Sequence, residues 1–149
     1  MLTQAKLHLA SLPEGKRISF KQANIIDANL DNASVVILNY TLQFIPVAQR
    51  AALLNRIRQA MSPGDVLILS EKLTLPDKRL NDYLIDLHHD FKRQQGYSDL
   101  QIAQKRQALE DVLVPETRQA HIDRLDTVGF SRSDTWFQCL NFASMIAIA

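Results

Sequence analysis

The segment 35–38 most constrains the fold of this chain, because it places four aliphatic residues, Val-Val-Ile-Leu, in a row. An uninterrupted run of this kind is typical of a strand buried on both faces, as in parallel sheets covered by helices. Asn39 follows directly and puts a polar side chain at the expected carboxyl end of the strand. Ligands of open α/β sheets bind outside the carboxyl ends of the strands. Asn39 is therefore a candidate ligand contact, with a buried, hydrogen-bonded strand end as the alternative interpretation.

Composition narrows the class of protein further. A chain of 149 residues fits one domain with one core. A net charge of +1 gives no electrostatic argument for direct binding to nucleic acid or to acidic membranes. The single cysteine, Cys139, excludes an internal disulfide framework and a cysteine-cluster metal site. No membrane-length apolar run and no signal-peptide pattern is found, so we expect a cytoplasmic location.

Hydrophobic periodicity and turn residues predict the remaining elements. We expect helices over residues 1–12, 47–61, 77–95, 98–112 and 115–128, and strands over 17–26, 66–71, 130–138 and 142–149. Residues 27–34, rich in Asp and Asn, are expected to form a loop. Strands that alternate with helices favour an α/β fold with a mostly parallel sheet, and Asn141 is typical of a turn in a closing antiparallel hairpin. Ser98 and Gln101 have the spacing of a capping box.

The same periodicity assigns side chains to the core or to solvent. The residues expected to be buried in the helices at 47–61 and 77–95 are Leu53, Leu54, Ile57, Met61, Leu80, Tyr83, Leu84, Leu87 and Phe91. Arg50 is expected on the solvated face of its helix. Trp136, Phe137 and Phe142 are expected in the core rather than on a stacking surface.

Few residues suggest chemistry by their spacing. The four glycines do not form a phosphate- or nucleotide-binding loop. His88 and His89 are unsuited to a shared metal, because neighbours on a helix point about 100° apart; a solvated or hydrogen-bonded pair is favoured. His8 and His121 are expected at the surface, and Cys139 as a small packed hydrophobe.

The run Gln104-Lys105-Arg106 lies on a predicted helix and allows two interpretations. A charged, solvated helix face is the simpler one. The alternative is an anion clamp, because a guanidinium binds a carboxylate through two parallel hydrogen bonds.

Several longer phrases together resemble one known family. They are NASVVILNYTLQF at 32–44, LSEK at 69–72, HHDFKR at 88–93, GYS at 96–98, QKR at 104–106 and WFQCLNF at 136–142. The sequence resembles the carboxy-S-adenosyl-L-methionine synthase family over almost all of its length. The resemblance implies a class I methyltransferase (Rossmann-like) fold that converts S-adenosylmethionine and prephenate into carboxy-S-adenosylmethionine and phenylpyruvate. The product serves wobble-uridine modification of tRNA.

The resemblance also implies roles for four residues. Asn39 corresponds to the family's Asn at the end of the fourth strand, which contacts the cofactor, S-adenosylmethionine or carboxy-S-adenosylmethionine. Arg106 corresponds to the Arg that reaches the carboxylate of carboxy-S-adenosylmethionine across a homodimer. Asn24 and Ile25 stand where the family usually has Asp-Ile beside the adenine, so an acceptor is kept but a charge is lost. No catalytic residue is assigned.

The resemblance begins part of the way into the family's fold. Met1 aligns with the helix after the second strand, so the first strand, its glycine loop and the acidic tip of the second strand are absent. We therefore expect residues 1–149 to form a single truncated domain, an incomplete class I fold without its first two strands, impaired or inactive as an enzyme. A non-catalytic binding or oligomerisation module is the alternative.

The family's sheet order, 3-2-1-4-5-7-6, has a consequence for the strand that begins at Val35. Without strands 1 and 2, this strand lacks a neighbour on one side. We expect either the predicted strand 17–26 or a second chain to fill the gap, because an open hydrophobic edge favours aggregation.

Overall fold

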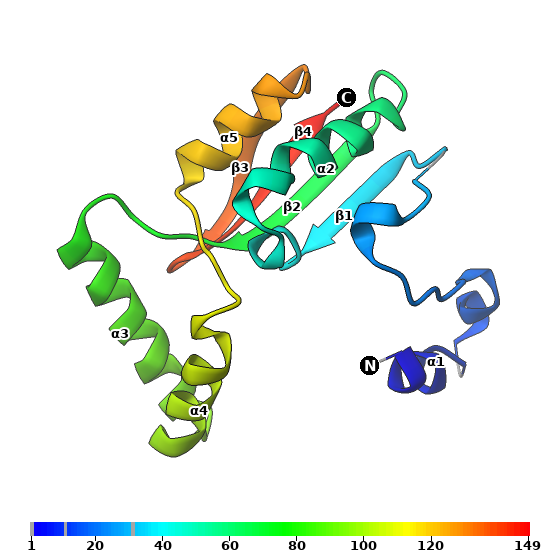
Figure 1. Ribbon diagram of the computed structural model, residues 1–149. Coiled ribbons are helices and arrows are strands. Elements are labelled where there is room, and N and C mark those ends of the chain that lie inside the picture. The colour runs from blue at the N-terminus through cyan, green and yellow to red at the C-terminus, as the bar shows by residue number, and fades with distance from the viewer. Residues whose placement is uncertain (1, 11, 31) are drawn as a thin grey trace.

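The computed structural model describes residues 2–10, 12–30 and 32–149, with the backbone alone at residue 14 (Figure 1). The helices are α1 (Leu2–Ala10), α2 (Val47–Gln59), α3 (Lys78–Gln94), α4 (Asp99–Glu110) and α5 (Arg118–Thr127). Short 3-10 helices are η1 (Pro13–Arg17), η2 (Ile25–Asp27) and η3 (Leu42–Phe44), and the strands are β1 (Val35–Asn39), β2 (Val66–Lys72), β3 (Arg132–Cys139) and β4 (Phe142–Ile148). Residues 1 and 11 of the first expected helix and residue 31 of the expected loop lie outside the described residues.

The four strands form one sheet in the order β1-β2-β4-β3. β1 and β2 are parallel, with Val35 opposite Val66, and β4 is antiparallel to both β2 and β3. This order matches strands 4-5-7-6 of the expected fold. The α/β class and the closing antiparallel hairpin are thus confirmed, with α2 and α5 on one face of the sheet (Figure 1).

The core lies between that face and the two helices. Leu53, Leu54 and Ile57 of α2, all expected to be buried, pack with alternate residues of β1, β2 and β4 and with Leu125 of α5. Each Å² of apolar surface that is buried contributes about 25 cal/mol to the free energy of folding, so this layer is the main source of stability.

β1 is buried on one face only, so the expectation of a strand covered on both sides is wrong. Leu38 is buried, but Val35 and Ile37 on the opposite face are 56% and 61% exposed. In the described part of the chain α2 and α5 cover only the first face. An aliphatic run shows that a strand is hydrophobic, but it does not show whether other elements cover both of its faces.

The strand expected over residues 17–26 is also wrong. Residues 18–24 have no regular structure, and Asn24 caps η2 by accepting the Ile26 N–H at 3.1 Å. Ile18 and Phe20 alternate, but polar residues interrupt the pattern and Ile25 and Ile26 are adjacent, so the strand face is not continued. β1 therefore remains an edge strand among the described residues, and its completion by a second chain stays a prediction.

The helix α3 begins and ends close to the expected residues, but its apolar face is not covered. Leu80, Tyr83 and Phe91 are exposed, and α3 and α4 extend away from the sheet (Figure 1). The capping box of α4 at Ser98 and Gln101 is confirmed. No helix in the described ranges is long and apolar enough to span a membrane.

Five further burial predictions are wrong. Arg50 and His121 are buried, whereas Trp136, Phe137 and Cys139 are exposed. Arg50 is buried because it finds four hydrogen-bond acceptors. Trp136 stands at a register shift between β3 and β4, where its indole N–H donates to the Ser144 hydroxyl at 2.9 Å.

Candidate functional site

A cavity of about 1050 Å³ lies beside the carboxyl ends of β1 and β2. Its walls come from the turn after β1, the last residue of β2, the facing sides of α3 and α4, and the β3–β4 turn. Because these segments are far apart in the sequence, only the tertiary fold brings them to one place.

Four cations line this cavity: Lys72 of β2, Lys92 of α3, and Lys105 and Arg106 of α4. None of them forms an ion pair or a side-chain hydrogen bond with another described residue. Acidic side chains are also present in the lining, at Asp82, Asp86 and Glu110, but Asp82 pairs with Lys78 of its own helix. The unpaired cations leave donors available for an anionic ligand.

The positive potential is visible in the acid–base properties of the lining residues. Burial and the nearby Lys92 and Arg106 lower the pKa of the Lys72 ammonium group. Burial and the lysines at 92 and 72 lower the pKa of His88 to about 4, so its imidazole is neutral at physiological pH. In both groups burial and the neighbouring positive charges disfavour the protonated form, and a bound anion would reduce the repulsion between the cations.

The remaining lining is largely apolar and aromatic. Phe44 stands at the turn after β1, and Phe137 and Phe142 come from the hairpin. The ring of His88 meets the edge of Phe142 with centroids 4.8 Å apart. The side chain of Cys139 also lines this cavity. A ligand with a carboxylate and an apolar body fits such a lining.

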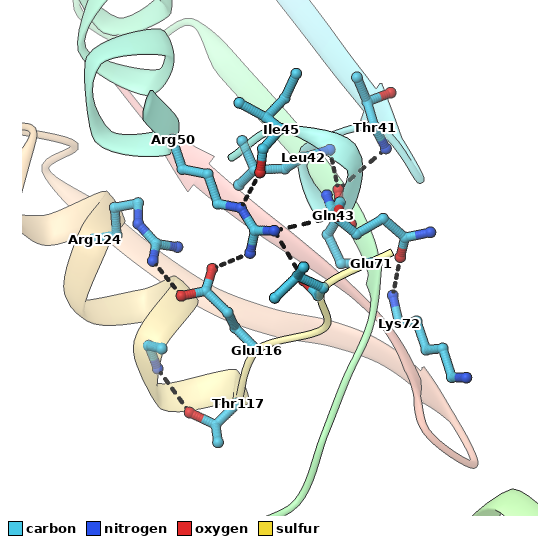
Figure 2. Close-up of polar contacts among 12 residues, drawn as sticks. Thr41, Leu42, Gln43, Ile45, Arg50, Glu71, Lys72, Glu116, Thr117 and Arg124 are labelled. Atoms are coloured by element: carbon cyan, nitrogen blue, oxygen red, sulfur yellow. Dashed lines mark hydrogen bonds and ion pairs between the residues drawn. The ribbon is translucent and has the colours of Figure 1, made fainter. Parts of the chain in front are cut away.

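A buried polar network supports the wall nearest β2 (Figure 2). The Arg50 guanidinium donates to the carbonyls of Gln43 and Val114 at 3.2 and 2.9 Å and pairs with Glu116. The other carboxylate oxygen of Glu116 accepts from Arg124 of α5 at 2.6 Å. The network joins the turn after β1 to the segment that leads into α5.

The residues singled out from the sequence have different positions. Arg106 is exposed on α4 and lines the cavity, and Asn39 is the exposed last residue of β1, directly before the cavity-lining Tyr40. Asn24 caps η2, and Ile25 is half-buried against the core. The structure brings Arg106 and the Asn39–Tyr40 corner toward one cavity, while Asn24 and Ile25 are not part of its lining.

Lys72, His88 and Lys92 line the cavity although no sequence pattern singled them out for this role. His88 and Lys92 are four residues apart on α3 and so share a helix face, and Lys72 directly follows an apolar strand. The helical spacing and the position of Lys72 after the strand are visible in the sequence. Neither indicates that α3 and the end of β2 line one cavity.

The described residues offer donors for a carboxylate group but no glycine loop for a nucleotide. The unpaired cations suit the carboxylate. No described glycine follows a strand and opens a helix, as a glycine loop that holds the rest of the cofactor would. Within the described ranges no group of three or more His, Cys, Asp or Glu could hold a metal ion.

Solved structures define the class of this fold as class I S-adenosylmethionine-dependent methyltransferase. The pyocyanin biosynthetic protein PhzM matches 99% of this chain with 39% of its own, at a TM-score of 0.69 and 17% identity. PigF, solved with SAH, matches 99% of this chain with 40% of its own at a TM-score of 0.64 and 16% identity. Human N-acetylserotonin methyltransferase, solved with SAM, matches 89% with 34%, at a TM-score of 0.59 and 17% identity.

Sequence relatives specify the family within this class. The carboxy-S-adenosyl-L-methionine synthase of Hahella chejuensis is 49% identical over 148 residues, which are 99% of this chain and 60% of the relative. The protein of the same name from Citrifermentans bemidjiense is 55% identical over 125 residues, 84% of this chain and 51% of its own. The chain is thus related over nearly its whole length to part of the carboxy-S-adenosyl-L-methionine synthases, which confirms the resemblance. It spans about 60% of the relative from Hahella chejuensis, and no family model matches it.

Proposed function

We propose that the cavity binds a small carboxylate ligand and that this is the part of a carboxy-S-adenosyl-L-methionine synthase site that the chain supplies. The observation that carries the proposal is the group of four unpaired cations around an aromatic lining at the carboxyl ends of two parallel strands. Ligands of open α/β sheets bind at this position.

In the reaction implied by the family, S-adenosylmethionine and prephenate give carboxy-S-adenosylmethionine and phenylpyruvate. Prephenate would lose its ring carboxyl group as CO2 and its ring hydroxyl group as hydroxide. The sulfonium methyl would give up a proton, which forms water with that hydroxide, and the resulting carbanion would bind the carbon of the CO2. Arg106 would neutralise the carboxylate that forms, and the aromatic lining would hold the ring of prephenate. Asn39 would contact the cofactor from the end of β1, with Asn24 and Ile25 on the adenine side.

We propose that the chain alone is impaired in the full reaction, since it spans about 60% of a relative that carries the enzyme name. The activity would take place in the cytoplasm, in a homodimer, and would serve wobble-uridine modification without direct contact between the chain and nucleic acid.

Calorimetric titration tests the binding proposal. The 149-residue chain is titrated separately with prephenate and with S-adenosylmethionine. Micromolar binding of S-adenosylmethionine would favour a working cofactor site, whereas binding of prephenate alone would favour a partial one. Cys139 gives an independent readout, because bound prephenate should slow alkylation of this exposed, cavity-lining thiol.

A second candidate is a non-catalytic binding or oligomerisation module. The observation in its favour is the uncovered apolar face of α3, where Tyr83 is 59% exposed and Leu80 and Phe91 are exposed as well. If this candidate is correct, calorimetry should show no heat of binding with prephenate or S-adenosylmethionine at millimolar concentration. Sedimentation experiments should show a stable dimer.

A further inference from the structure

Glu71, the residue before the end of β2, carries a buried carboxylate that the proposed function does not use. Glu71 has no exposed surface, and both of its oxygens accept hydrogen bonds from the turn after β1 (Figure 2). Oε1 accepts from the backbone N–H groups of Thr41 and Leu42 at 3.2 and 2.8 Å, and Oε2 accepts from that of Gln43 at 3.0 Å.

The residues on either side of Glu71 bind the same turn. The carbonyl of Ser70 accepts the N–H of Tyr40 at 2.8 Å, and the N–H of Lys72 donates to the side-chain oxygen of Gln43 at 3.0 Å. Four consecutive N–H groups, those of residues 40–43, are therefore held by two consecutive residues of β2.

This turn forms part of the cavity wall. Tyr40, Gln43 and Phe44 all line the cavity, as does the side chain of Lys72. Tyr40 has a φ of 51°, a left-handed conformation that a bulky residue adopts only when its surroundings impose it. The bonds to Ser70 and Glu71 supply such a constraint on both sides of this residue.

A carboxylate suits these three amides better than any neutral group. An apolar side chain at position 71 would leave the buried N–H groups of Leu42 and Gln43 and the half-buried N–H of Thr41 without acceptors. The cost is about 1–3 kcal/mol for each buried group. A carboxamide has only one accepting oxygen, and its NH₂ group would face an N–H donor. Bonds to an ionised acceptor are also about twice as strong as neutral ones.

We propose that Glu71 is a positioning residue, which fixes the turn 40–43 against β2 and thereby sets the wall of the cavity. For its effect on ligand binding the inference rests on the proposed function. For its effect on the turn it stands on the hydrogen bonds alone.

The acid–base behaviour of Glu71 gives a way to observe this contact. Burial raises the pKa of the Glu71 carboxyl to about 7, against the opposing effect of the N–H groups of Leu42, Gln43 and Thr41. The carboxyl group therefore titrates where the folded chain can be studied.

The test compares Glu71→Gln with Leu67→Val, a change of an equally buried residue in the same strand that does not touch the turn. In Glu71→Gln the amide hydrogens of residues 41–43 should exchange about tenfold faster than in the wild type. Prephenate should bind about tenfold more weakly. Both changes correspond to the loss of one net hydrogen bond. Amides of Leu53 and Leu54 in α2 should be unchanged relative to Leu67→Val. Glu71→Asp, which keeps the charge but shortens the side chain, should restore part of both properties.

Amide exchange at residues 41–43 could be faster in Glu71→Gln than in Leu67→Val while the wild-type chain does not bind prephenate. That result would reject the proposed function and keep the positioning role. Equal exchange at these amides in Glu71→Gln and Leu67→Val would overturn the inference. If Glu71→Gln does not fold, NMR titration of the wild-type chain decides. The amide shifts of residues 41–43 should then follow the Glu71 carboxyl carbon with one midpoint, and amide shifts that do not follow it would overturn the proposal.

Discussion

At the scale of single residues, buried polar groups join segments that the sequence separates. The Arg50 guanidinium donates to the Ile45 carbonyl at 2.9 Å as well as to Gln43, Val114 and Glu116, so one α2 side chain binds two loops. A buried guanidinium of this kind is stable only while its partners remain, because an unpaired charge in the interior is very unfavourable.

Arg50→Met should therefore destabilise the protein strongly. The substitution keeps the apolar stem but removes the Arg50 donor from the carbonyls of Ile45 and Val114 and leaves Glu116 with Arg124 alone. We expect the free energy of unfolding to fall by about 3–5 kcal/mol in urea denaturation. Arg79→Met, at an exposed position of α3, is the control and should change it by no more than about 0.5 kcal/mol. Similar losses in both variants would contradict the role of the network.

The burial of His121 should make the stability of the protein depend on pH. Its ring nitrogens have no hydrogen-bond partner among the described residues, and burial lowers its pKa to about 4. The unfolded chain, in which this pKa is about 6.5, binds the proton first. The contribution of His121 to stability is therefore full above pH 6.5, is lost as the pH falls toward 4, and is on the order of 3 kcal/mol.

The measurement is the free energy of unfolding as a function of pH for the wild type and His121→Leu. Their difference isolates His121 from Glu71, whose raised pKa acts oppositely and makes stability fall as pH rises from 4.5 toward 7. Parallel curves for the two proteins between pH 4 and 6.5 would show that His121 does not titrate as the structure implies.

Substitutions at Arg106 should affect ligand binding but not the stability of the fold. Arg106→Lys keeps the charge but loses the planar fork, so prephenate binding should weaken while the melting temperature is unchanged. Arg106→Ala at this exposed position should alter the free energy of unfolding by no more than about 0.5 kcal/mol. Unchanged prephenate affinity in Arg106→Lys, measured by calorimetry, would favour the simple charged helix face.

At the scale of elements, β1 is an edge strand of the sheet with one uncovered face. It pairs only with β2, and its uncovered face presents Val35 and Ile37. The neighbouring positions on that face, Val66 and Ile68 of β2, are only half-buried. Unpaired backbone groups beside exposed aliphatic side chains form a template for association with another chain.

Ile37→Lys should reduce this association without unfolding the chain. A charge on an exposed edge strand disfavours strand pairing between molecules, and the side chain has room in solvent. Sedimentation velocity over a range of concentrations should show less self-association than for the wild type. Val47→Lys, which places the same charge at an exposed position of α2, is the matched control. An equal reduction in the two variants would indicate a general charge effect instead.

At the scale of the whole molecule, the sheet has one covered face and an open edge, and α3 and α4 stand apart from it (Figure 1). The relative from Hahella chejuensis contains a further 40% of its length that this chain does not match (100% less the 60% covered). Additional elements of that kind could cover the open edge and the exposed aliphatic face together.

We expect the unmatched part of the Hahella chejuensis relative, supplied as a separate polypeptide, to bind this chain. Covering Val35 and Ile37 would stabilise the folded state by mass action. The melting temperature should rise with the concentration of the added polypeptide, and Ile37→Lys should abolish the rise. A melting temperature that does not depend on the added polypeptide would contradict this prediction.

The sequence by itself determined the local elements after residue 34 and their order. The aliphatic run at 35–38, the capping box at Ser98 and the closing hairpin were all predictable, because periodicity, caps and turns act over a few residues. Family resemblance added the sheet order, and it singled out Arg106, which lines the cavity in the structure.

Only the tertiary structure decided which side chains are buried and which meet in the cavity. Arg50 and His121 are buried and Tyr83 and Trp136 are exposed, all against the expectation from sequence. Lys72 and Lys92 line one cavity, which the sequence did not indicate. Helical or strand spacing shows that an element has an apolar face but not whether another element covers it. Burial and the grouping of charges depend on contacts between segments distant in the chain, and those contacts form only when the sheet and its helices pack.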